Sequence, residues 1–481
     1  MMLLDLQLAL PELFMLSMTC ILLLADLFIP EHRRGLTHLL ATLTLVFAAI
    51  LTMRLMMAPG EEALAFSGTF IRDRFGDILK VFSYLTLAAV FIYAKHYLRQ
   101  FNLMKGEFYS LSLFALLGIM VMISAGSMLT LYLGLELLGL ATYALVALNR
   151  DSLPGSEAAM KYFILGSLAS GLLLYGMSLL FGATGTLALA EIGESLGGGA
   201  VENPLMLTFG LVFVVVGVSF KLGVVPMHMW VPDVYHGSPL ATTLFIATVP
   251  KIAGLALVIR LLDDGLANLH GDWQMMVAVL AGLSLVLGNL AAIAQTNIKR
   301  MLAYSTISHM GFMLLGILAG SRDGYASAMF YTLAYVVMSA GAFAVVIMVS
   351  SNGREAQEID DFKGLAKRNP WQAFLMLMLM FSLAGIPVFL GFFAKWQVIA
   401  ATINAGFTNL AILAVVTAVI GAFYYLRVVK VMYFDEPEDE QAIAMPHDFK
   451  ALLSANGLAV LALGLFSGGL IDLCISAFAA G

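Results

Sequence analysis

Four ionisable side chains lie inside long apolar stretches of this 481-residue sequence: Glu136, Lys221, Lys251 and Lys395. In a lipid bilayer, a charged side chain near the centre of a helix costs roughly 2.5–3.5 kcal/mol on insertion scales. Such residues usually face a protein interior or a wet cavity, and they mark proton or ion pathways. The alternatives are a lysine that snorkels from a helix end and a structural ion pair.

The chemistry that these residues suit is proton transfer. A buried lysine amine accepts a proton when neutral, and a nearby carboxylate reverses that preference, whereas arginine stays protonated. Lys251 and Lys395 have apolar sequence on both sides, while Lys221 lies near the end of a charge-free run, where snorkelling is the alternative. A pair of Glu136 with Lys221 would satisfy both charges, and a change in their separation would switch Lys221. A static ion pair remains the structural alternative.

Hydroxyl and imidazole groups also interrupt the apolar stretches. His309 follows Tyr304 and Ser305, and Tyr331 and Tyr335 are spaced to share one helix face. Histidine bridges lysines in a relay near neutral pH. We predict His309 as a relay member and the other four as relay or supporting residues, with ordinary helix–helix hydrogen bonds as the alternative.

Composition defines the class of protein. Hydrophobic residues make up 61% of the chain and charged residues 12%, against about 25% charged in soluble domains. The chain is therefore expected to be an all-α polytopic membrane protein. It contains two cysteines, no haem-attachment or dinucleotide motif, no metal-ligand spacing and no basic patch for nucleic acid. We expect no metal, no cofactor and no catalytic residue in this chain.

A membrane-spanning helix needs about 20 mostly apolar residues, and the sequence has about fourteen such runs. They lie near residues 6–29, 36–57, 77–98, 108–124, 126–148, 158–184, 205–225, 239–261, 273–295, 300–320, 325–349, 370–400, 406–433 and 451–478. Basic residues are concentrated in the connections that follow odd-numbered spans. The positive-inside rule then places those connections in the cytoplasm and both termini outside. In this assignment of basic residues, Lys80 and Lys299 belong to connections between spans and not to the membrane interior.

Two predicted spans contain signals for a discontinuous helix. Pro226 follows the seventh span near residues 221–226, and Gly385 and Pro387 interrupt the twelfth near 385–387. Pro250 is a further helix-breaking residue, directly before Lys251. The two discontinuities are five spans apart, so their surroundings would have opposite orientations, as inverted repeats do. Broken helices at matching positions in inverted repeats indicate an ion path.

These residues carry a family resemblance that extends over essentially the whole chain. Residues 220–239 read FKLGVVPMHMWVPDVYHGSP, Lys251 follows, and the surroundings of Glu136 and Lys395 fit the same pattern. The chain resembles the antiporter-like proton-translocating subunits of respiratory complex I. In that family, Pro250 stands where a small residue is more usual.

The resemblance implies one integral membrane domain, 1–481. It comprises N-terminal helices in 1–107, two inverted five-helix repeats in 108–261 and 273–433, and a last helix in 451–478. It implies a coupled pair of Glu136 and Lys221, a central Lys251, a bridging His309, and Lys395 facing the exit. Flavin mononucleotide, iron–sulfur clusters, NADH and quinone would be bound by partner subunits. Neighbouring antiporter-like and small membrane subunits would be the partners, in a bacterial inner membrane.

Proton translocation driven by NADH–quinone electron transfer is therefore the predicted function. Two alternatives use the same sequence features. One is a subunit of a cation/proton antiporter or of a membrane-bound hydrogenase-type complex. The other is a non-conducting membrane scaffold whose buried charges are structural.

Overall fold

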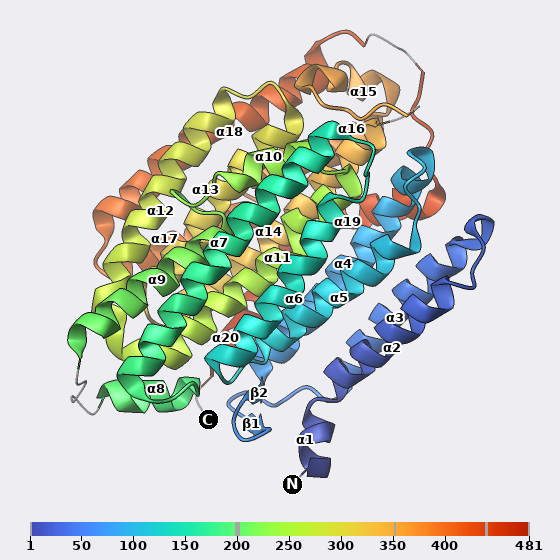
Figure 1. Cartoon of the computed structure of the whole chain (residues 1–481). Helices are drawn as coiled ribbons and strands as arrows, with labels where there is room; N and C mark the ends of the chain where they lie inside the picture. The colour runs from blue at the N-terminus through green and yellow to red at the C-terminus, as the bar shows by residue number, and fades with distance from the viewer. Residues whose placement is uncertain (1, 198–202, 351–352, 438–440, 480–481) are drawn as a thin grey trace.

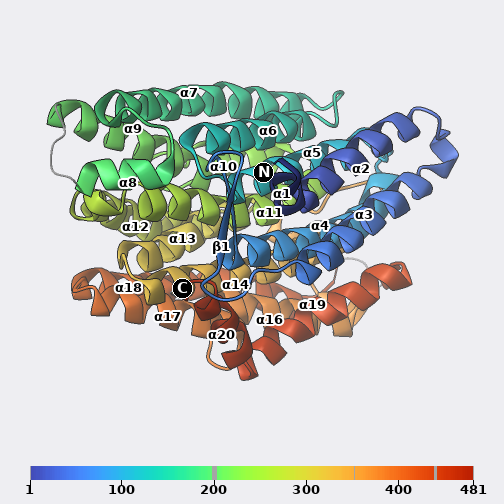
Figure 2. The ribbon, with the colours of Figure 1, turned by 90° about the horizontal axis from the view of Figure 1, so that it is seen from below.

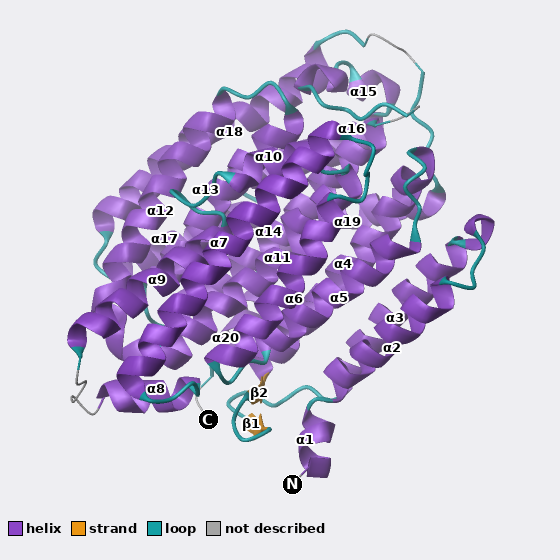
Figure 3. Cartoon of the chain, viewed as in Figure 1, coloured by secondary structure: helices purple, strands orange, loops and turns teal. Residues whose placement is uncertain are grey.

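The structure, a computed structural model, describes residues 2–197, 203–350, 353–437 and 441–479. Long helices lie side by side with their axes in one common direction, and the two strands are confined to one end of the bundle (Figure 1; Figure 3). Helix α1 (Met2–Leu8) and helix α20 (Gly468–Ser476) lie at that same end. An even number of crossings places both ends of a chain on one side.

The N-terminal part contains three long helices and a hairpin. Its helices are α2 (Leu10–Asp26), η1 (Glu31–Arg33), α3 (Gly35–Arg54) and α4 (Arg74–Gln100). Strands β1 (Glu62–Ala65) and β2 (Phe70–Asp73) pair antiparallel, with Glu62 opposite Asp73. The Asp73 carboxylate accepts a hydrogen bond from Gly76 N, so the hairpin leads directly into a capped α4.

Helices of the two predicted repeats follow in order. The first group comprises α5 (Gly106–Ile123), α6 (Met128–Val146), α7 (Leu153–Thr184), α8 (Leu189–Gly197), α9 (Pro204–Leu222), α10 (Trp230–Gly237), α11 (Leu240–Ile259), η2 (Arg260–Gly265) and η3 (Ala267–Leu269). The second comprises α12 (His270–Ile293), α13 (Ile298–Leu318), α14 (Arg322–Val349), η4 (Ile359–Phe362), α15 (Leu365–Arg368), α16 (Pro370–Ala384), α17 (Leu390–Asn404) and α18 (Thr408–Phe434). Helix α19 (His447–Leu465) then precedes α20.

The predicted class, an all-α polytopic membrane protein, is confirmed. In the part of the chain that the structure describes, 12 helices are long and apolar enough to cross a membrane. They correspond to twelve of the predicted spans. The first predicted span falls on α2, with 17 residues, and the twelfth falls on α16 and α17, with 15 residues each. The total of fourteen spans stays a prediction, as do the inverted repeats.

Helices α11, α13 and α14 form the centre of the bundle. In Figure 2 they lie between a layer that contains α7 and α9 and a layer that contains α16, α17 and α18. The most apolar stretches of α11 and α13 are 94% buried, against 39% for α7 and 33% for α18, whose apolar faces are left for lipid. The central helices carry most of the predicted relay residues.

Both predicted discontinuities are present in the backbone. Helix α9 ends at Leu222, and Gly223 takes the left-handed conformation with φ 76°. Helix α16 ends in the same way, with Gly385 at φ 87°. Pro226 and Pro387 lie in the non-helical segments that follow.

The prediction that Pro250 breaks its helix is wrong. Helix α11 continues through Pro250 to Ile259. Proline removes one backbone donor and crowds one carbonyl, which bends or weakens a helix without necessarily ending it. Here α11 is packed on every side, so the surrounding helices hold it together.

Candidate functional site

Lys251 lies at the centre of the bundle, on α11, with 2% of its surface exposed. Its Nζ donates a hydrogen bond to the carbonyl oxygen of Leu222 at 3.4 Å. The ring of Trp230, from α10, lies 5.6 Å from the same nitrogen, within range of a cation–π contact. Leu222 is the last residue of α9, so its carbonyl oxygen has no partner in its own helix.

Lys395 has the same kind of environment at the other discontinuity. It lies on α17, is 8% exposed, and donates from Nζ to the carbonyl oxygens of Leu383 and Ala384, both at 2.9 Å. These two residues end α16. The ring of Phe312, from α13, lies 5.1 Å from Nζ.

We call this arrangement a carbonyl seat: a lysine amine held by free carbonyl oxygens at the C-terminal end of a broken helix, beside an aromatic ring. The C-terminal end of a helix carries a partial negative charge, which stabilises an ammonium without a carboxylate. A neutral amine also donates to a carbonyl and keeps its lone pair free to accept a proton. The seat therefore suits a group that changes its protonation state.

A small cavity lies between Lys221 and Lys251. It has a volume of about 30 Å³, and Thr142, Tyr162 and Trp230 are among its lining residues. That volume is room for about one or two water molecules. A bridging water would connect two amines that do not touch each other.

Glu136 and Lys221 do not form the direct ion pair that the sequence predicts. Among the described residues, no nitrogen–oxygen contact of 4.0 Å or less joins them, and Glu136 Oε1 is buried without a hydrogen-bond partner. Lys221 Nζ instead faces the next turn of α6, where a Cβ atom added to Gly139 would lie 3.6 Å from it. The absence of a side chain at Gly139 leaves room for the amine at this position.

His309 is the centre of a hydrogen-bonded network between three helices. Its Nδ1 lies 2.6 Å from the Tyr331 hydroxyl of α14, and its Nε2 lies 3.0 Å from the Tyr425 hydroxyl of α18. Tyr425 also bonds to Ser305 Oγ. Because each hydroxyl both donates and accepts, the imidazole can change tautomer without losing either partner.

The remaining predicted hydroxyls divide into two cases. Tyr335 bonds to Thr306 Oγ1 at 2.8 Å, and its ring centre lies 5.0 Å from that of His309, so it borders the network. Tyr304 is partly exposed and forms no side-chain hydrogen bond to another described residue. The structure therefore places Tyr335 beside His309 and Tyr304 outside the network.

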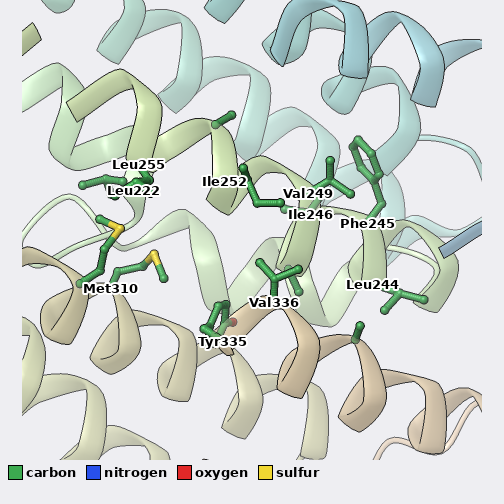
Figure 4. Close-up of a cluster of buried hydrophobic side chains, with 14 of the residues drawn as sticks. Leu222, Leu244, Phe245, Ile246, Val249, Ile252, Leu255, Met310, Tyr335 and Val336 are labelled. Atoms are coloured by element: carbon green, nitrogen blue, oxygen red, sulfur yellow. The ribbon is translucent and has the colours of Figure 1, made fainter. Parts of the chain in front are cut away.

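Apolar packing surrounds these polar groups. Phe312 stacks on Tyr331 at 5.8 Å and also lies beside Lys395, so it separates the His309 network from the second carbonyl seat. Figure 4 shows the dense cluster of buried apolar side chains around α11, to which Val249 and Ile252 belong. A charge in this region has few polar partners other than those described above.

Sequence reasoning missed several members of the site. Tyr425 and Trp230 contact relay residues directly, and Tyr424 bonds to Asn289, which bonds to Ser308. Their partners lie far away in the sequence, so no spacing identifies them. The available signal was a pair of adjacent tyrosines in an otherwise apolar span.

Two further buried lysines were assigned to connections by their sequence position. Lys80 is 1% exposed inside α4 and pairs with Glu12 of α2 at 2.6 Å. Lys299 is 1% exposed at the start of α13 and pairs with Glu355 at 3.1 Å. Both have carboxylate partners, which distinguishes them from Lys251 and Lys395.

Helix α10, which carries Trp230, is fixed by a surface ion-pair cluster. Asp233 contacts Lys161 of α7 and Arg300 of α13, both at 2.9 Å. Partial burial favours a higher pKa for Asp233, but the hydrogen bonds and charges of Lys161 and Arg300 outweigh it and lower that pKa below its usual value. The cluster ties α10 to its neighbours on both sides.

Fold and site together define a class: a polytopic membrane protein with two discontinuous helices that each seat a buried lysine, and with a histidine hydrogen-bond network on its central helices. In the described segments, no group of three or more His, Cys, Asp or Glu side chains could hold a metal ion. A family model described as "NADH:quinone oxidoreductase/Mrp antiporter, TM" matches residues 125–421.

Similar sequences identify the family of the chain more specifically. It is 55% identical over 475 residues to NADH-quinone oxidoreductase subunit N of Thioalkalivibrio sulfidiphilus (strain HL-EbGR7), which covers 98% of each chain. It is 53% identical to the protein of the same name from Nitrosomonas europaea (strain ATCC 19718 / CIP 103999 / KCTC 2705 / NBRC 14298), over 98% of this chain and 97% of that one. The chain therefore belongs to the NADH-quinone oxidoreductase subunit N family, and the resemblance noted from its sequence is confirmed.

Solved structures agree. A chain of respiratory complex I from Thermus thermophilus with bound Aureothin is 31% identical, with a TM-score of 0.82 over 96% of this chain and 98% of that one. A chain of the Mrp complex from Dietzia sp. DQ12-45-1b has a TM-score of 0.85 over 100% of this chain and 97% of that one. At 22% identity, that second likeness concerns the fold alone.

Proposed function

We propose that this chain is a proton-translocating membrane-arm subunit of an NADH–quinone oxidoreductase, and that its buried lysines conduct the proton. The observation that carries the proposal is the carbonyl seat at both helix discontinuities. Lys251 and Lys395 lie in the membrane interior, and no carboxylate among the described residues contacts either amine. Such a site is unfavourable for a permanent charge and suits a group that gains and loses its proton.

The proton path runs from Lys221 through Lys251 and His309 to Lys395. Water in the 30 Å³ cavity connects the first two amines. His309 passes the proton between the halves by exchanging its bonds to Tyr331 and Tyr425. Glu136 controls the first step, because its approach to Lys221 would favour the ammonium and its withdrawal would release the proton.

A cavity beside α17 supports an exit near Lys395. It has a volume of about 270 Å³ and lies between α14, α17 and α20, with Asp323, Ser327, Gln397 and Asn404 among its lining residues. The connections that contribute to it are those that the loop charges predict to be periplasmic. Polar side chains next to the helix that carries Lys395 provide a place for released protons to reach water.

Coupling to a strongly driven reaction is required. Moving one charge against 100 mV needs about 2.3 kcal/mol. We infer that the energy comes from NADH-to-quinone electron transfer in partner subunits, which bind flavin mononucleotide and iron–sulfur clusters. The relatives' names and the similarity to a complex I chain support these partners. The chain would lie in a bacterial inner membrane with both termini periplasmic, and its two inverted repeats would span 108–261 and 273–433.

Replacing Lys251 with alanine tests the proposal. In membranes that contain the assembled complex, Lys251→Ala should abolish or strongly reduce the number of protons pumped per electron through this subunit. Lys430→Ala is the matched control, since Lys430 is a surface lysine, 63% exposed, paired with Asp435. Unchanged pumping by assembled Lys251→Ala complex would instead support a non-conducting scaffold.

A further inference from the structure

A second polar cavity lies at the opposite end of the bundle from the proposed exit. It has a volume of about 340 Å³, and its lining includes Tyr97, Asn149, His236 and Glu355. These residues come from the ends of α4, α6 and α10 and from the segment after α14. All four connections follow odd-numbered predicted spans, which loop charge places in the cytoplasm.

Glu355 is the ionisable group of this cavity with the most contacts to the protein interior. Its Oε2 lies 3.1 Å from Lys299 Nζ, and its Oε1 accepts a hydrogen bond from the Tyr97 hydroxyl. The backbone N of Leu240 donates to the Tyr97 hydroxyl at 3.2 Å and to Oε1 at 3.4 Å. The Glu355 side chain is 17% exposed, whereas Lys299 is 1% exposed, so the carboxylate lies between the cavity and the interior.

The position of Leu240 connects this carboxylate to the relay. Leu240 is the first residue of α11, the helix that carries Lys251 about 16 Å further along at 1.5 Å per residue. A carboxylate is stabilised at a helix N-terminus by the exposed N–H groups and the helix dipole. Glu355 therefore lies at one end of α11, and the first carbonyl seat lies near its middle.

Buried hydroxyl groups continue inward from the cavity. Ser238 lines it, and its Oγ lies 2.8 Å from Thr243 Oγ1. Deeper in the bundle, the bonded pair of Thr306 and Tyr335 borders His309. Hydroxyls both donate and accept, so they pass protons when water bridges the gaps.

We propose that Glu355 is the proton-collecting carboxylate of an inlet on the cytoplasmic side, loaded from water in this cavity. The inference rests on the proposed function of the lysine relay. In each cycle the Glu355 carboxylate accepts a proton from a hydronium ion that enters the cavity, which leaves a neutral water molecule and one proton fewer on the cytoplasmic side. The protonated acid then releases that proton inward, by way of water and the Ser238 hydroxyl. Lys299 Nζ, 3.1 Å from Oε2, is the partner of the carboxylate on its interior side.

Four variants separate this role from a structural one. Glu355→Gln keeps an oxygen that accepts from Tyr97 and Leu240 but cannot bind a transferable proton. Glu355→Gln with Lys299→Gln removes the unpaired buried charge that the single variant leaves. Glu355→Asp keeps an acid, and Asp360→Asn removes a carboxylate that is 66% exposed on the same connection and pairs with Lys363.

Proton uptake is measured in inverted membrane vesicles, per assembled complex, with NADH as the donor. We expect Glu355→Gln and the double variant to slow uptake through this subunit about tenfold. That is less than the roughly 10²–10⁴-fold contribution of a positioned proton-transfer group, because cavity water still delivers protons. Glu355→Asp should retain most of the wild-type rate, and Asp360→Asn all of it.

Two results would overturn the inference: wild-type uptake by Glu355→Gln, or recovery of the wild-type rate in the double variant, which would mean that Glu355 only neutralises Lys299. Lys251→Ala, measured in the same assay, tests the proposed lysine relay independently of the inlet. If Lys251→Ala does not take up protons while Glu355→Gln does so at the wild-type rate, the inlet proposal is wrong and the relay proposal still stands.

Labelling gives a test that does not depend on the Glu355 variants. His236→Cys, in a chain with Cys20→Ser and Cys474→Ala, places one thiol in the cavity wall. A charged, membrane-impermeant thiol reagent should modify it in inverted vesicles and not in right-side-out vesicles. Modification from the periplasmic side, or from neither side, would contradict an inlet at this cavity.

Discussion

The Nζ of Lys395 lies 2.9 Å from the carbonyl oxygen of Ala384, the last residue of α16. That oxygen is free because Gly385 turns the chain out of the helix. The same residue supplies the room for the lysine, since a Cβ atom on Gly385 would lie 2.9 Å from Lys395 Cδ. One glycine therefore frees the acceptor and makes space for the donor.

Gly385→Ala should displace Lys395 and reduce proton pumping. Gly406→Ala is a matched control, because Gly406 has the same φ of 87° but no atom within 4 Å of an added Cβ. Each change should cost roughly 1–2 kcal/mol of stability, the penalty of a left-handed conformation for a residue with a side chain. Only Gly385→Ala should also lower the ratio of protons to electrons. Equal pumping by the two assembled variants would show that Gly385 is not needed for the function of the carbonyl seat of Lys395.

Lys251→Arg is expected to be as defective as Lys251→Ala. A guanidinium donates to the Leu222 carbonyl and contacts Trp230, so charge and binding partners are retained. It does not release its proton, because arginine stays protonated in proteins. Proton pumping by assembled Lys251→Arg complex, measured as for the alanine variant, tests this. Pumping at the wild-type level would show that the positive charge, and not its exchange, is what matters at this position.

Much of the architecture follows from the sequence because the bilayer restricts what a membrane chain can do. Apolar length identifies the spans, and glycine followed by proline marks the helix ends at Leu222 and Ala384. The orientation that loop charge gives stays a prediction. Pro250 was misjudged because the outcome depends on how tightly the neighbours pack α11, which a single sequence does not reveal.

Contacts between distant side chains are what sequence reasoning could not supply. Lys251 and Lys395 were identified by their isolation in apolar sequence, but their acceptors are backbone carbonyls, which have no residue signature. The assumption that a buried lysine needs a nearby carboxylate favoured a direct Glu136–Lys221 contact. The Lys221 amine lies instead beside Gly139, on the next turn of α6, where the missing side chain leaves room for it.

Tyr425→Phe should slow proton transfer through the His309 network. The change removes the hydroxyl that bonds both His309 Nε2 and Ser305 Oγ and leaves those buried groups without that partner. An unsatisfied buried group costs about 1–3 kcal/mol, so stability should also fall. Tyr304→Phe is the control, because the Tyr304 hydroxyl forms no side-chain hydrogen bond to a described residue. If the two variants pump alike in the assembled complex, Tyr425 has no part in the relay.

A double-mutant cycle on Glu136 and Lys221 tests whether the two act as a switch. Glu136→Gln should leave assembly and stability nearly unchanged, since Glu136 Oε1 has no partner to lose, yet it should reduce pumping by removing the charge that Lys221 responds to. Lys221→Met removes the responding group, so adding Glu136→Gln to it should change little further. Pumping rates of the two single variants and the double variant, converted to free energies, give the coupling between the residues. Additive effects would mean that they act independently, and the first step of the path would then need another control element.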